Sequence, residues 1–152
     1  MKLTNKQALT AYNEVFEAFV SNEPLPVNAV NLVVYAVQDL QVRDYLLGHA
    51  PISLGVTRAI EFVTEILPLV EEGARTPFYA VMSAWYYEAG DKELAFASLV
   101  QSQVLDPNYS LSNLLERVYK AGWDNNAFAT MRSELHPKVE ATFEVEEELA
   151  IA

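Results

Sequence analysis

Residues 76–109 read TPFYAVMSAWYYEAGDKELAFASLVQSQVLDPNY, and this stretch decides the fold. Thr76 is suited to cap a helix, and Pro77 follows at the first helical position, where a missing N–H removes no hydrogen bond. Gly90 can adopt the left-handed conformation that ends this helix, and Asp91 is suited to cap a second one. Large and small residues recur at three- and four-residue spacing in both halves: Tyr79, Met82, Ser83, Tyr86, Ala95, Leu99 and Ser102. The pattern predicts an antiparallel helical hairpin.

The rest of the chain also carries helical periodicity. We expect helices over residues 4–20, 28–39, 40–48, 53–73, 110–122 and 125–135. The segment NLVVYAV at 31–37 has a strand as its rival interpretation; helix is preferred because no second strand would pair with it. The second helix is so apolar that we expect it in the middle of the bundle. Gly48 and Pro51 should stop the third helix, and Pro68 should kink or end the fourth.

These elements predict an all-α fold: a single-domain bundle of about seven or eight short helices, with the hairpin at 76–109 as its centre. The helical domain is expected to span residues 1–135. From position 134 onward the chain contains six glutamates and one lysine. Because glutamates near a helix C-terminus oppose the helix dipole, residues 136–152 are expected to form an acidic, partly disordered tail.

The amino-acid composition excludes several classes of protein. Hydrophobic residues make up 51% of the 152 residues and charged ones 20%, which is a folding composition. The absence of cysteine excludes a disulfide scaffold, a Cys-ligated zinc site and a thiol nucleophile. No apolar run is long enough for a membrane span or a signal peptide, so we expect a soluble cytoplasmic protein with no membrane partner.

The net charge of −11 is the extreme feature of the composition. Such a charge repels phosphate backbones, and only ten Lys and Arg residues are scattered along the chain, which disfavours nucleic-acid binding. The alternative is that the acidic surface imitates a nucleic acid and occupies a DNA-binding protein.

Catalytic and metal-binding signatures are missing. His49 and His136 have no neighbour at metal-ligand spacing, so each is interpreted as a loop or surface histidine. Glu61 and Glu65 stand one helical turn apart and are interpreted as a solvated face. No G-x-S-x-G nucleophile elbow or glycine-rich phosphate cradle occurs. We therefore expect no enzyme activity, no metal and no cofactor.

Adjacent charges at Arg43 and Asp44 do not share a helix face. Each is expected to pair elsewhere and to fix the short third helix to the bundle, as a structural ion pair rather than a binding site.

The hairpin resembles the tetratricopeptide helical hairpin, in which small residues stand where the two helices touch. The resemblance covers one hairpin, because the frame does not recur one period earlier or later. The side that such a hairpin offers to a peptide corresponds here to Ala80, Ala84, Tyr87 and Glu88, so these residues are the predicted partner-binding surface.

A wider resemblance covers residues 27–123. VRDYLLG at 42–48, the stretch at 84–115 and the following AGW are similar to the C-terminal half of an actinobacterial and actinophage family, domain of unknown function four-one-nine-two. The Leu-Leu-Gly-Phe and Ser-Leu-Val segment of that family has no match here. The resemblance implies origin and fold but supplies no activity. The leading hypothesis is a non-catalytic adaptor that binds another protein or itself.

Overall fold

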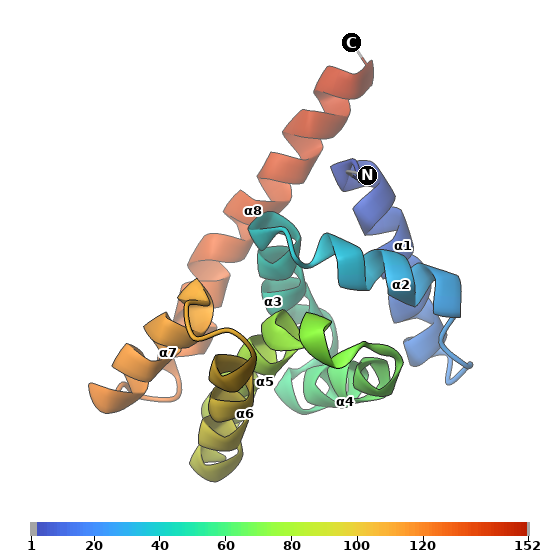
Figure 1. Ribbon diagram of the computed structural model, residues 1–152. Coiled ribbons are helices and arrows are strands. Elements are labelled where there is room, and N and C mark those ends of the chain that lie inside the picture. Colours follow the sequence, from blue (N-terminus) through green and yellow to red (C-terminus); the bar gives the residue numbers. More distant parts are fainter. Residues whose placement is uncertain (1–2, 152) are drawn as a thin grey trace.

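The computed structural model describes the backbone of residues 3–151 and the side chains of residues 3–143, and within that part of the chain every regular element is helical (Figure 1). Eight α-helices and two short 3₁₀ helices follow one another there, so the predicted all-α fold is confirmed. Their bounds are α1 Asn5–Val20, α2 Val27–Ala36, α3 Leu40–Leu54, α4 Val56–Ile66, η1 Leu67–Leu69, η2 Glu72–Ala74, α5 Thr76–Glu88, α6 Lys92–Leu105, α7 Ser110–Lys120 and α8 Ala127–Ile151. The rival strand at 31–37 is wrong, because this segment lies mostly in α2.

The predicted hairpin is formed by α5 and α6. Gly90 has φ +88° and ends the first helix, and the Asp91 carboxylate accepts a hydrogen bond from the Leu94 N–H at the start of the second. The Ser83 hydroxyl donates to the Ala95 carbonyl at 2.7 Å near the turn. At the far end a second buried hydroxyl, that of Ser102, reaches the first residue of α5. These paired contacts show that the two helices run antiparallel; the tetratricopeptide likeness stays a prediction.

The central helix is α5, and the prediction that the second helix occupies the middle is wrong. α5 contacts α4, α6, α7 and α8, and its Trp85 and Phe78 are almost completely buried. α2 packs mainly on α1 and leaves Val27 and Tyr35 about half exposed. In Figure 1, α1, α2 and α4 lie on one side of α5, with α6 and α7 on the other. Because α5 is apolar at almost every position, it is stable only with other helices packed around it.

The third helix does not stop at Gly48 or Pro51; α3 continues to Leu54. A proline inside a helix cannot donate to the carbonyl four residues earlier, which here belongs to Leu47. The indole N–H of Trp85 donates to that carbonyl at 3.2 Å. A tertiary hydrogen bond therefore replaces the helical one, and α3 tolerates its proline.

At the fourth helix, Pro68 acts as predicted. α4 ends at Ile66, and Pro68 lies in the single 3₁₀ turn of η1. The start of this helix differs from the prediction, because Gly55 (φ +82°) occupies the N-cap position in place of Ser53.

The last helix continues past His136 and Pro137, so the expected end near residue 135 is wrong. The side chains of His136 and Phe143 are buried against the core, and α8 contacts α1, α3 and α5. Burial of these rings offsets the hydrogen bond that Pro137 removes. The division into a domain at 1–135 and a partly disordered tail at 136–152 stays a prediction, and residue 152 lies outside the described residues.

Among the described residues, every helix is too short or too polar to cross a lipid bilayer.

Candidate functional site

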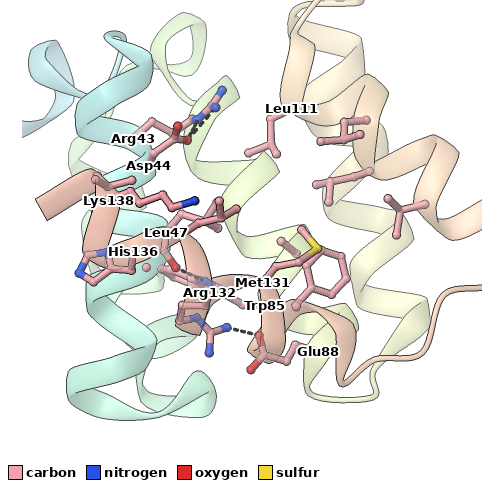
Figure 2. Close-up of a pocket in the computed structure, with 18 of the residues that line it drawn as sticks. Arg43, Asp44, Leu47, Trp85, Glu88, Leu111, Met131, Arg132, His136 and Lys138 are labelled. Atoms are coloured by element: carbon pink, nitrogen blue, oxygen red, sulfur yellow. Dashed lines mark hydrogen bonds and ion pairs between the residues drawn. The ribbon is translucent and has the colours of Figure 1, made fainter. Parts of the chain in front are cut away.

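A groove of about 500 Å³ lies between α3, α5, α7 and α8, and we call it the central groove (Figure 2). Most of its lining is apolar. The lining residues are Arg43, Asp44, Leu47, Gly48, Ala84, Trp85, Glu88, Leu111, Leu114, Leu115, Val118, Trp123, Phe128, Met131, Arg132, Leu135, His136, Lys138, Val139 and Thr142. A volume between about 300 and 1,000 Å³ is typical of small-molecule sites.

The floor of the central groove is closely packed. Trp85 is 1% exposed, and its only polar side-chain atom is engaged by the Leu47 carbonyl. Leu115 and Val118 are buried beside it on α7. The floor therefore presents carbon to the groove without an unpaired polar atom from the indole.

Ion pairs lie at the two ends of the central groove in Figure 2. At one end Arg43 donates to the Asp44 carboxylate at 2.8 and 3.0 Å and to the Tyr109 hydroxyl at 3.2 Å. At the other end Arg132 on α8 pairs with Glu88 on α5. The prediction that Arg43 and Asp44 pair elsewhere is wrong, since the long guanidinium side chain reaches its neighbour's carboxylate and a distant tyrosine together.

Lys138 is the remaining cation of the central groove. In Figure 2 its ammonium points across Leu47 into the hollow. Among the described side chains no carboxylate lies within 4 Å of it.

The predicted partner-binding surface is only partly accessible. Ala80, Ala84 and Tyr87 are buried, so they do not lie on an exposed face of the hairpin. Ala84 and Glu88 contribute to the central groove, whereas Ala80 and Tyr87 do not. The hydroxyl of Tyr87 donates to the Trp123 carbonyl, which ties α5 to the loop after α7. The neighbours α7 and α8 cover the side that an isolated hairpin would offer to a peptide.

A second cluster joins the two histidines, contrary to the prediction that each is a loop or surface residue. Their ring centroids are 6.4 Å apart, and Tyr45 stacks on His49 at 5.2 Å. The His49 ring also hydrogen-bonds the hydroxyls of Tyr12 at 2.9 Å and Ser53 at 3.2 Å. We call Tyr12, Tyr45, His49, Ser53 and His136 the histidine cluster.

Burial controls the charge of this cluster. It lowers the pKa of both imidazoles, and the neighbouring ring of His136 lowers the pKa of His49 further. Glu140, 3.3 Å from His136 Nε2, opposes the shift. His136 Nδ1 is buried with no hydrogen-bond partner in the described structure. Within the described residues no group of three or more potential ligands could hold a metal ion.

The outer face of α6 is a third feature. Phe96, Val100 and Val104 are 45%, 55% and 76% exposed and follow one another at four-residue intervals. The opposite side of α6 carries the buried residues Ala95, Ser98, Leu99 and Ser102, which face the core. We call Phe96, Val100 and Val104 the α6 outer face.

Sequence reasoning missed both the central groove and the α6 outer face. The spacing of Phe96, Val100 and Val104 was visible in the sequence, but the stripe of Ala95 and Leu99 already accounted for the helix. The α8 wall of the groove was missed because the helix was expected to end near residue 135.

Comparison with known proteins gives a family match. The family described as "Domain of unknown function (DUF4192)" matches residues 2–125, which includes α1 to α7 and stops before α8. No curated protein and no solved structure matches the chain.

Proposed function

The chain belongs to the DUF4192 family, whose description states no function, and on that premise we propose that it is a non-catalytic helical adaptor that binds another protein through the α6 outer face. The proposal includes a cytoplasmic location and the actinobacterial or phage origin expected from the resemblance.

The observation that carries the proposal is that α6 is apolar on two opposite faces. A helix at the surface of a monomer normally has one apolar face and one polar face. Here the inner face packs on α5, while Val100 and Val104 are more than half exposed on the outer face. Contiguous exposed apolar residues of this kind are typical of protein interaction sites.

The surroundings indicate the chemistry of the partner. Glu93 falls on the same side of α6 by helical spacing. Glu116 on the neighbouring α7 pairs with Lys120 and Gln103. Glu93 is therefore the carboxylate that flanks this face without an ion-pair partner among the described residues. The chain as a whole has a net charge of −11. The partner is therefore an apolar helix face flanked by Lys or Arg, which would be steered to this surface by charge and held by apolar burial.

The test is a double variant, Val100→Glu with Val104→Glu. Both side chains are exposed, so the melting temperature should stay nearly unchanged. Affinity purification from the native cell, with mass spectrometry, should lose the partner that wild type retains. Leu94→Glu is the matched control, because Leu94 is 44% exposed on another side of the same helix. Retention of every partner by the double variant would refute the proposal.

A second candidate, an acidic nucleic-acid mimic, is favoured only by the net charge of −11. It predicts competition with duplex DNA for a DNA-binding protein that fades as salt rises. The double variant Val100→Glu with Val104→Glu distinguishes the two candidate functions. It adds negative charge, so it should not weaken binding of a nucleic-acid mimic to its DNA-binding partner, whereas it should abolish partner binding by the adaptor.

A further inference from the structure

We propose that the central groove binds a long-chain monocarboxylate, an amphiphile with one carboxylate head and a linear apolar tail. This site is separate from the α6 outer face, so the inference goes beyond the proposed function and does not depend on it.

The shape of the central groove favours a small ligand over a protein segment. Its volume of about 500 Å³ suits a small molecule. Ion pairs stand at both ends, Arg43 with Asp44 at one and Arg132 with Glu88 at the other (Figure 2). A polypeptide entering and leaving the groove would have to cross these charges, whereas a ligand with two ends of its own can lie between them.

The tail of the ligand would lie on apolar side chains from three helices. Trp85 and Leu115 form a buried floor. The tail would lie above it on Leu47 of α3, Leu114 of α7 and Met131 of α8, which are more accessible. The indole N–H is already bonded to the Leu47 carbonyl. An alkyl chain that lies over this buried floor therefore removes no hydrogen bond from the ring.

The head of the ligand is assigned by charge. Three cations and two carboxylates line the central groove, in a chain whose net charge is −11. Arg43 and Arg132 are each paired with a carboxylate, which leaves Lys138. Its ammonium points over Leu47 into an apolar hollow, and no described carboxylate lies within 4 Å of it. A single negative charge joined to an apolar body complements this arrangement.

Sodium decanoate, below its micelle concentration, is the first probe. Tryptophan fluorescence and calorimetry should report saturable binding of one molecule per chain. Decan-1-ol has the same tail without the charge and should bind about fivefold more weakly, as expected for loss of one partly exposed ion pair. From octanoate to decanoate the affinity should rise by up to about fourfold for each buried methylene.

Two variants locate the site. Lys138→Gln should weaken decanoate about fivefold and leave decan-1-ol unchanged. Lys120→Gln is the matched control, because Lys120 is an exposed lysine that pairs with Glu116 on α7, outside the groove. Met131→Trp should fill the hollow and abolish binding of both probes, with circular dichroism confirming the fold. The α6 variants should bind decanoate as wild type does, which separates this proposal from the adaptor function.

Three results would overturn the proposal. The first is the absence of saturable decanoate binding. The second is equal affinity for decanoate and decan-1-ol in wild type, or a decanoate affinity that Lys138→Gln leaves unchanged. The third is a dimer, seen by light scattering, that Met131→Trp dissociates, because a second copy of the chain would then occupy the central groove.

Discussion

Trp85 donates its indole N–H to the carbonyl of Leu47, the helical carbonyl that Pro51 leaves without a partner. This single bond connects the interior of α3 to the central helix α5. It explains how a proline can lie inside α3, and it fixes the ring that forms the floor of the central groove.

The first prediction is a coupling between Trp85 and Pro51. Trp85→Phe should lower the free energy of unfolding by about 3 kcal/mol, because it removes buried volume and leaves the Leu47 carbonyl unpaired. In the Pro51→Ala background the same substitution should cost about 1 kcal/mol less, because an alanine in place of the proline supplies the helical N–H.

Urea denaturation of the two single variants and the double variant measures this coupling. Trp123→Phe is a control for loss of an indole, since Trp123 is 43% exposed. Additivity of Trp85→Phe and Pro51→Ala within about 0.5 kcal/mol would contradict the compensation described here.

The second prediction concerns the contact between α3 and α8. A β-carbon added at Gly48 would overlap the imidazole of His136 near its attachment to the backbone, where the ring cannot swing away cheaply. Gly48→Ala should therefore destabilise the protein by about 1–2 kcal/mol, even though alanine is the better helix former.

Gly73→Ala is the matched control, because a β-carbon there meets no atom within 4 Å. Thermal unfolding should separate the two alanine variants by several degrees. If Gly48→Ala melts at or above the wild-type temperature, the close packing of His136 on α3 does not limit stability.

The third prediction is acid sensitivity from the histidine cluster. Burial lowers the pKa of His49 and His136 in the folded protein. The unfolded chain then binds protons first, at its ordinary value of about 6.5. The stability from this cluster is complete above that pH and is lost as the pH falls through the lower pKa of the folded state.

Urea midpoints measured from pH 7.5 to 5.0 should fall, and His136→Gln should flatten the profile. Glu140→Gln removes a carboxylate that favours the charged ring of His136, so it should steepen the loss. A wild-type midpoint that does not change above pH 5 would show that neither imidazole resists protonation.

Local signals in the sequence were sufficient for the central hairpin except at its first cap. Thr76 is the first residue of α5 instead of its N-cap, Arg75 stands at the N-cap position, and no described side chain caps the helix. The turn at Gly90, the cap at Asp91 and the small residues between the two helices each depend on near neighbours, and the structure has all of them. Pro68 ended its helix for the same local reason.

The proline predictions that were wrong depended on distant partners. Pro51 is tolerated because of Trp85, and Pro137 lies in a helix whose His136 and Phe143 are buried by the core. The central groove could not be predicted either, because one of its walls is α8, which the sequence predicted to end near residue 135. The histidine cluster likewise brings together His49 and His136, whose proximity no spacing along the chain could indicate.

The fourth prediction tests whether α8 belongs to the folded domain. Phe143 is 4% exposed and packs edge-on against Tyr45 at 5.2 Å. Phe143→Ala should therefore lower the free energy of unfolding by about 3 kcal/mol, whereas Leu135→Ala, at a position 51% exposed on the same helix, should change it by less than about 0.5 kcal/mol. A chain that ends after Leu135 loses both Phe143 and the buried ring of His136, so it should be less stable than Phe143→Ala in urea. Equal stability of this shortened chain and the full chain would instead place the domain boundary at residue 135, because the packing of α8 on α3 would then contribute nothing.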